Sequence, residues 1–147
     1  MGTIPIVGQG ALNRIATHLV VANYTNLNVT PSYLGKNQIA VHSRDPASKL
    51  LPTATGGVSS PEPYQFWDID MDLLKSQAFS WNWLTQMRTN CNLGPITAYS
   101  DAPSTWQPMQ FKSAQLVTVD PEAFDGDHQI VRVRLEAVYE INSILWG

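Results

Sequence analysis

The sequence predicts a mainly β protein, an antiparallel β-sandwich or barrel with one flanking α-helix. Three observations support this fold class. Apolar and polar residues alternate with a period of two in several short segments, as in half-buried strands. One segment, residues 76–90, has a helical period and contains no Gly or Pro. Most links between the segments are too short for parallel crossovers, so the strands should run antiparallel.

Six or seven strands are expected along the chain. The first is rich in β-branched residues and precedes a polar turn. Two more should flank a turn at Gly35–Asn37, and the rest are bounded by Gly, Pro, Asn or Asp. The expected strand regions are residues 14–22, 29–43, 64–73, 95–100, 109–120 and 129–142.

Two of these strands show the alternation most clearly. In the stretch YQFWDIDMDLLK, Trp67, Ile69, Met71 and Leu73 alternate with Phe66, Asp68, Asp70 and Asp72. In the last strand, Val131, Val133, Leu135, Ala137, Tyr139 and Ile141 alternate with Arg132, Arg134, Glu136 and Glu140. Each strand should therefore bury one face, and the charged face of the last strand could form charge pairs.

The helical segment should begin near a Ser76 cap and stop at CNLGP. One face of this helix carries the apolar side chains expected to face the core, namely Phe79, Trp83, Leu84 and Met87. Trp81 lies roughly 130° from the centre of that face. It is a candidate anchor for contact between subunits, and burial under a neighbouring loop of the same chain is the alternative.

Residues 44–63 form the longest stretch without an expected strand or helix, and prolines and a Gly56-Gly57 pair interrupt it. Structureless loops longer than about 12–15 residues are uncommon in compact domains and usually bind something. Leu50 and Leu51 in its middle favour docking against a partner over free solvation.

The composition limits the class of protein. The 147 residues fit one domain, and only 14% are charged, against about 25% in ordinary soluble domains. With five Trp and five Tyr, such a chain should cover part of its surface with copies of itself or with partners. A monomer with a neutral, polar surface is the alternative. The net charge of −3 argues against binding nucleic acid through its phosphates.

The amino-terminal residues lack the features of a signal peptide, and no apolar stretch approaches the length of a membrane span. Cys91 is alone, so no disulfide can form within the chain. We therefore expect neither a leader nor a membrane contact.

The Asp68-x-Asp70-x-Asp72 pattern could belong to a catalytic or metal site. A nucleophilic aspartate of the dehalogenase kind should end a parallel strand, whereas this strand continues through the aspartates. A calcium loop would need Gly and Glu where Leu73 and Phe79 stand. A metal–phosphate site stays formally open, but no nucleotide-binding loop accompanies it. We expect no catalytic residue, no metal site and no cofactor.

The remaining chemically active side chains form no recognisable site. His18, His42 and His128 are widely spaced, and Gly8-Gln9-Gly10 lacks the third glycine of a dinucleotide loop. The three aspartates are best interpreted as one face of a strand. Unpaired burial of carboxylates is costly, so this face should be in water. In a closed ring of identical subunits it would line a hydrated, negative channel.

Three stretches resemble tail tube (major tail) proteins of tailed bacteriophages. They are VGQGALNRI near the start, GGVSSPEPYQ with DLLKSQ in the middle, and YEINSILWG at the end. The likeness extends over nearly the whole chain and includes the order of elements. None of the three stretches is a motif with chemical meaning.

The resemblance implies a tail tube-like fold of two orthogonally packed antiparallel sheets with a flanking helix. It also implies hexameric rings that stack into a hollow tube in the virion tail, assembled in the host cytoplasm. The partners would be further copies of the chain, with sheath and baseplate proteins as candidates, and DNA would pass without specific binding. An N-terminal arm (1–13) and the loop 44–63 would reach the next ring.

The expected site residues follow from this scheme. Asp68, Asp70 and Asp72 are the candidates for the lumen, and Trp81, Leu50 and Leu51 are the candidates for contacts between subunits. Three other hypotheses stay open. They are another tail or baseplate ring component (a terminator or a secretion-tube homologue), a small β-rich ligand-binding module, and an enzyme that uses the acidic triplet with a divalent metal.

Overall fold

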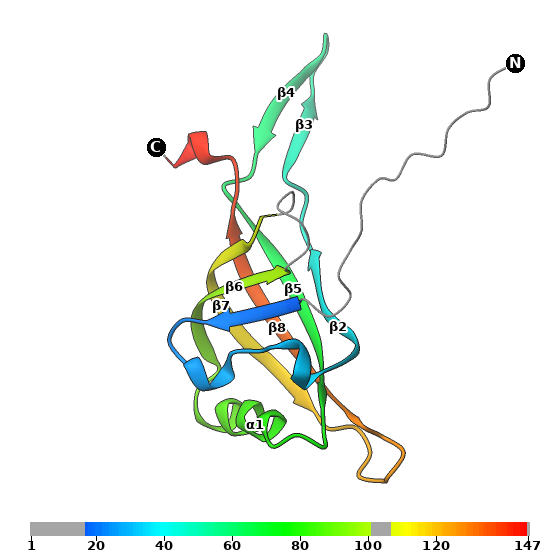
Figure 1. Ribbon diagram of the computed structural model, residues 1–147. Helices are drawn as coiled ribbons and strands as arrows, with labels where there is room; N and C mark the ends of the chain where they lie inside the picture. The colour runs from blue at the N-terminus through cyan, green and yellow to red at the C-terminus, as the bar shows by residue number, and fades with distance from the viewer. Residues whose placement is uncertain (1–16, 101–106, 147) are drawn as a thin grey trace, which may run out of the picture.

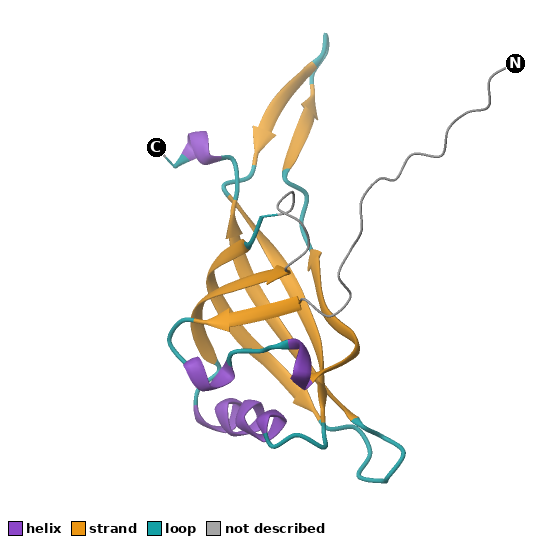
Figure 2. Cartoon of the chain, viewed as in Figure 1, coloured by secondary structure: helices purple, strands orange, loops and turns teal. Residues whose placement is uncertain are grey.

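The computed structural model describes residues 17–100 and 107–146, and these residues form a mainly β fold (Figures 1 and 2). The described residues contain eight β-strands, one α-helix and three short 3-10 helices. The expected fold class is confirmed. The expected arm at 1–13 lies outside the described residues.

Six strands form one antiparallel sheet. In spatial order they are β1 (Thr17–Val21), β6 (Asn92–Ser100), β7 (Met109–Asp120), β8 (Ile130–Glu140), β5 (Tyr64–Leu74) and β2 (Leu34–Ser43). The sheet curls until its two edges approach each other, and the Thr17 hydroxyl donates a hydrogen bond of 2.6 Å to the Gln38 side-chain oxygen. A single curled sheet, a half-barrel, thus encloses the core where the resemblance implied two orthogonal sheets (Figure 1).

The segment 44–63 is not the irregular loop that the sequence predicted. It contains a two-stranded hairpin of β3 (Ser48–Pro52) and β4 (Gly57–Pro61), closed by a 2.8 Å hydrogen bond from Thr53 N to Gly56 O. The hairpin projects beyond one end of the sheet (Figure 1). Every residue of β3 is exposed, so these strands have no buried face and no alternation that sequence reasoning could detect.

The turn expected at Gly35–Asn37 is also absent. Residues 34–43 form one continuous strand, whose register against β5 shifts between Leu34 and Ile39. Gln38 has a positive φ of 52° at this irregularity. The polar residues that resembled a turn therefore form a bulge, which bends the strand without ending it.

The core lies on one face of the curled sheet and is closed by helix α1 (Phe79–Thr89), together with the short helices η1 (Thr25–Leu27) and η2 (Pro31–Tyr33). Trp83 is completely buried, and the Phe79 ring stacks on Tyr33 with centroids 4.1 Å apart. The predicted apolar helix face is confirmed, because Leu84 and Met87 also pack against the core.

The predicted start of this helix is wrong. Ala78 is its N-terminal flanking residue and Ser76 does not cap it. The first turn is held instead by the Ser80 hydroxyl, which donates to Gln77 O at 3.0 Å. In the part of the chain that the structure describes, no helix has the length and apolar character needed to cross a membrane.

Candidate functional site

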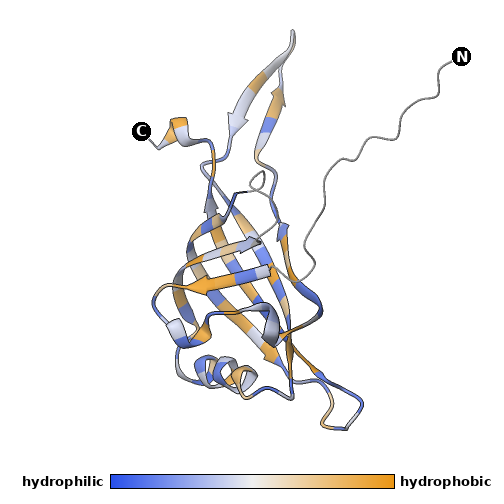
Figure 3. Cartoon of the chain, viewed as in Figure 1, coloured by the Kyte–Doolittle hydropathy of each residue, from blue (hydrophilic) through white to orange (hydrophobic). Residues whose placement is uncertain are grey.

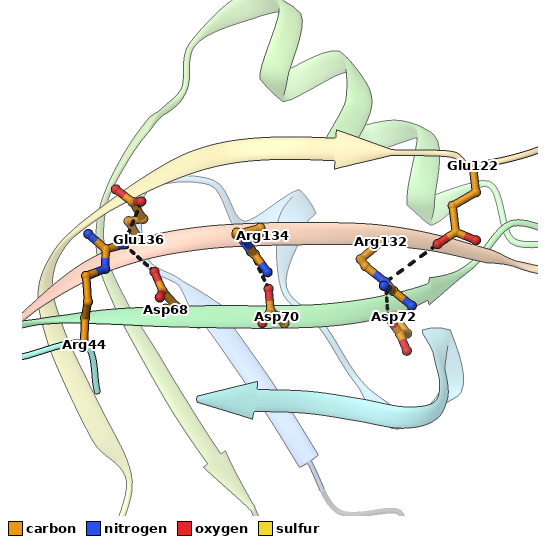
Figure 4. A network of polar contacts seen from close by, with 8 residues as sticks. All are labelled: Arg44, Asp68, Asp70, Asp72, Glu122, Arg132, Arg134 and Glu136. Atoms are coloured by element: carbon orange, nitrogen blue, oxygen red, sulfur yellow. Dashed lines mark hydrogen bonds and ion pairs between the residues drawn. The ribbon is translucent and has the colours of Figure 1, made fainter. Parts of the chain in front are cut away.

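Two of the three aspartates of β5 face arginines of β8, and the third, Asp68, faces Glu136. The antiparallel register places Asp70 opposite Arg134 and Asp72 opposite Arg132. Arg134 Nε donates to Asp70 Oδ1 at 2.9 Å, and Arg132 Nε lies 3.6 Å from Asp72 Oδ1. Figure 4 shows these pairs side by side along the two strands.

The remaining ion pairs each include one residue that belongs to neither β5 nor β8. Arg44, just after β2, binds both Asp68 of β5 and Glu136 of β8, the latter at 2.7 Å. Arg132 also lies 3.7 Å from Glu122 in the β7–β8 turn. We call these eight residues the charge ladder: Arg44, Asp68, Asp70, Asp72, Glu122, Arg132, Arg134 and Glu136 (Figure 4).

The expectation that the aspartates stand unpaired in water is therefore corrected. Each has an arginine partner, and Asp72 is only 8% exposed and also accepts a 3.2 Å hydrogen bond from the Asn37 amide. Pairing with cations and hydrogen-bond donors is what permits a carboxylate to lie this deep in a protein.

The charge ladder still carries a net negative charge. Five carboxylates face three guanidinium groups, so the sum is 3 − 5 = −2. Hydrogen bonds to Asp68 and Glu136 raise the pKa of Arg44, and the hydrogen bond to Asp70 raises that of Arg134. Both guanidinium groups stay charged at any ordinary pH, so the ladder keeps its sign near neutrality.

The charge ladder lies on the face of the sheet opposite the core. Ile69, Met71 and Leu73, which alternate with the three aspartates, are all buried. Within the described residues, no group of three His, Cys, Asp or Glu side chains could hold a metal ion. The arrangement is a hydrated ionic surface, and the position of the three aspartates in a lumen stays a prediction.

A second feature is an apolar surface at the hairpin end of the molecule. It consists of exposed side chains from the hairpin, the start of β5 and the carboxyl-terminal turn. Leu50 is 73% exposed and Ile144 is 88% exposed. The full set, called here the hairpin end, is Leu50, Leu51, Val58, Tyr64, Phe66, Ile144, Leu145 and Trp146. In Figure 3 apolar residues are visible in both the hairpin and the carboxyl-terminal turn.

A third feature is a groove lined by residues of helix α1 and of the β7–β8 turn. These two elements lie at the end of the sheet opposite the hairpin (Figure 1). Its volume is about 440 Å³, and Trp81 and Phe124 line it with exposed fractions of 59% and 89%. Lys75 Nζ donates to Ala123 O and lies 5.7 Å from the centre of the Phe124 ring. We call this the Trp81 groove. Trp81 is thus exposed. The alternative interpretation, burial under a neighbouring loop of the same chain, is wrong, and its role in contact between subunits stays a prediction.

The rim of the Trp81 groove is acidic. The exposed carboxylates Glu122, Asp125 and Asp127 lie on the turn that contributes Phe124, and exposed Asp120 ends β7 just before it. Lys75 is the one charged residue in the lining of the groove itself. His128 Nδ1 lies 2.6 Å from Asp125 Oδ1, and this hydrogen bond lowers the pKa of Asp125. Sequence reasoning did not single out Phe124, although an aromatic residue in an otherwise polar turn was a usable signal.

Comparisons with known proteins identify no family. No family model and no curated protein matches the chain. One solved structure similar to it is the cap of the anti-feeding prophage, described as its tube-terminating cap. The two chains are 9% identical with a TM-score of 0.48, and the alignment covers 93% of this chain and 92% of that one. A likeness of this degree establishes no shared function, so functional inference must come from the surfaces described above.

Proposed function

We propose that this protein is a virion structural protein, a tail tube subunit whose stacked rings form a DNA-conducting channel. The sequence resemblance suggests the role. The structural observation that carries it is the separation of two different apolar surfaces, the hairpin end and the Trp81 groove, at opposite ends of the molecule (Figure 1).

This distribution favours open, head-to-tail assembly. Of the eleven exposed large hydrophobic side chains in the described residues, eight belong to the hairpin end and two to the Trp81 groove. Two unlike surfaces form a heterologous contact, which generates rings or open stacks and not a closed dimer. A tube needs this kind of contact along its axis.

The hairpin is suited to enter the Trp81 groove of the next copy. An isolated two-stranded hairpin is marginally stable in water, and the exposed β3 strand gains little from its own chain. Lys49 is the one charged residue between Ser48 and Pro61. Four carboxylates lie on the turn beside the groove or next to that turn, against the single cation Lys75 in the lining. The charges of the two surfaces are therefore complementary.

Lateral contacts within a ring have a candidate in the edge of the sheet. The β1 edge is partly occupied by the chain itself, because Leu19 exchanges backbone hydrogen bonds of 3.1 and 2.8 Å with Val29. In the described part of the chain, β2 has a strand ladder with β5 alone, and on its other side the Thr17–Gln38 hydrogen bond joins it to β1. Unpaired strand edges are templates for pairing with another chain.

The charge ladder supplies a suitable wall for the channel. A hydrated face with a net charge of −2 in each copy repels the phosphates of passing DNA, and each arginine on this face is already paired with a carboxylate. In this proposal Asp68, Asp70 and Asp72 face the lumen, and further partners are sheath and baseplate proteins.

Negative-stain electron microscopy of the purified protein tests the proposal. Stacked rings or tubes are the expected result. Single rings that never stack would favour a terminator or baseplate ring, and a compact monomer at high concentration would overturn the proposal. Sedimentation would give the mass of each species.

The axial contact has its own test. Lys49→Glu should reduce stacking because it places a carboxylate against the acidic rim of the groove. Lys112→Glu on β7 is the matched control with the same change in net charge. Equal effects of the two variants on tube length would show that total charge, and not the hairpin–groove contact, is responsible.

A further inference from the structure

The carboxyl-terminal turn is bound to the base of the β3–β4 hairpin. Strand β8 ends at Glu140, and Asn142 then adopts the left-handed conformation with φ 49° and ψ 62°. This conformation is unfavourable for most residues, but Asn tolerates it well. The backbone turns away from the line of β8 here, and the short helix η3 (Ser143–Leu145) follows (Figure 1).

The side chain of Asn142 connects both strands of the hairpin. Its Nδ2 group donates to Ala47 O at 3.1 Å and to Glu62 O at 2.6 Å. Ala47 immediately precedes β3 and Glu62 immediately follows β4, and Glu62 N donates to Ala47 O at 3.0 Å. One amide group therefore bridges the two strands just below Ser48 and Pro61, the last residue pair of the hairpin.

Trp146 and Ile141 complete the contact. The Trp146 indole donates to Pro63 O at 2.9 Å and to Ile141 O at 3.0 Å. Ile141 N also donates to Pro63 O at 3.2 Å. The bonds to Pro63 O reach the hairpin at its base, where its direction relative to the sheet is decided, and the bond to Ile141 O holds the turn itself together.

We propose that residues 141–146 form a latch that fixes the direction in which the hairpin projects, with Asn142 as its positioning residue. Hydrogen bonds from Arg44 N to Phe66 O and from Gln65 Nε2 to Asp45 O hold the chain to β5 as far as residue 45. Beyond that point a two-stranded arm with no buried face would otherwise swing about residues 46–47 and 62–63. The latch holds both sides of that hinge against strand β8. Only its consequence for assembly rests on the proposed function.

The direction of the hairpin matters because ordering a mobile arm costs free energy on binding. An arm already held in its bound orientation loses less conformational entropy when it enters a partner. The latch would thus strengthen stacking without touching the next copy.

Two substitutions separate the hydrogen bonds from the backbone conformation. Asn142→Gly keeps the left-handed conformation accessible and removes the amide. Asn142→Asp keeps nearly the same shape but presents only acceptor oxygens to the two carbonyl groups. Trp146→Phe keeps an aromatic ring and removes the indole donor.

Hydrogen exchange of the unassembled protein, isolated by size exclusion, gives the readout. In the two Asn142 variants, the amides that are hydrogen-bonded between β3 and β4 should exchange about tenfold faster. In Trp146→Phe they should also exchange faster, but to a smaller extent. Amides in the middle of β5 and β8 should keep their protection, which shows that the sheet is still folded. Unchanged exchange in the hairpin of both Asn142 variants would overturn the latch.

Electron microscopy of the same variants separates this inference from the proposed function. If the wild-type protein forms tubes, the latch predicts shorter tubes for the Asn142 variants, and tubes of normal length would refute its role in assembly. If the wild-type protein stays monomeric, the proposed function fails, whereas the exchange experiment still decides whether the latch exists.

Discussion

Replacing Asp68, Asp70 and Asp72 together with Asn should reverse the charge of the ladder without unfolding the protein. The ladder holds five carboxylates and three guanidinium groups, so its net charge changes from −2 to 3 − 2 = +1. Each Asn keeps the size and polarity of the Asp that it replaces. The substitution therefore tests charge and leaves the packing of the strand intact.

The cost in stability can be estimated from the contacts. The pairs of Asp68 and Asp70 are solvated, and such pairs contribute about 0.2–1 kcal/mol each. Asp72 is nearly buried beside Asn37 and Arg132, so its loss should cost about 1–2 kcal/mol. The total of about 1.4–4 kcal/mol is smaller than the typical stability of a domain, about 5–15 kcal/mol.

Binding of a short DNA duplex, followed by fluorescence anisotropy at several salt concentrations, is the assay. The variant should gain weak, salt-dependent binding, because Arg44, Arg132 and Arg134 then face the duplex without their full set of partners. A control triple variant, Glu62→Gln with Asp127→Asn and Glu140→Gln, has the same net charge and an unchanged ladder.

Two results would refute this reasoning. Equal DNA binding by the ladder variant and the control would show that total charge, and not this face, determines adhesion. Unfolding of the ladder variant at room temperature would show that the aspartates are needed for the fold far beyond the estimate above. Circular dichroism and thermal unfolding give this second measurement. Assembly of the ladder variant into rings should proceed as in the wild type.

Three further predictions concern other surfaces of the molecule. Deleting Lys49–Gly57 should preserve the fold of the monomer and block ring stacking, because the hairpin contributes little to the core; tubes of normal length in electron micrographs would remove the hairpin from the mechanism. Trp83→Ala should lower the free energy of unfolding by about 3–5 kcal/mol because this side chain is fully buried, whereas Trp81→Ala, two residues away, should change it by less than about 0.5 kcal/mol and yet impair stacking; chemical denaturation and sedimentation measure the two effects, and normal stacking of Trp81→Ala would exclude the groove. His128→Ala should raise the pKa of Asp125 in a carboxyl-carbon NMR titration, because the hydrogen bond from His128 now lowers it. A lowered pKa in the folded state gives a stabilisation that is present above the ordinary carboxyl pKa and is lost as the pH falls through the folded value, so the variant and wild type should converge in stability at strongly acidic pH; an unchanged Asp125 pKa would contradict this assignment.

The periodicities of the sequence were sufficient to predict much of the fold. Alternation identified the strands that became β5 and β8, and it assigned Ile69 and Val133 to the buried face. The helical period separated Trp83, which is buried, from Trp81, which is exposed. These features are local. In a segment with one face in the core and one in water, apolar residues must recur with the period of its own backbone, about two residues in a strand and about 3.6 in a helix.

The hairpin escaped sequence analysis for the opposite reason. Strands β3 and β4 have no buried face, so their sequences need no alternation of apolar and polar residues. Their pairing depends on backbone hydrogen bonds and on the contact of Asn142 with Ala47 and Glu62, which are 95 and 80 residues away along the chain. A local sequence pattern cannot predict contacts between residues so far apart along the chain.

The sequence by itself determined which residues share a face of each strand and of the helix. Only the tertiary structure decided which faces meet. Asp70 and Arg134 are 64 residues apart, and the register of β5 against β8 places them in contact. That register depends on the packing of the whole sheet, because sliding one strand by a single residue would turn its apolar side chains from the core into water. Tertiary packing thus turned an acidic triplet, which the sequence predicted to stand unpaired, into a ladder of ion pairs.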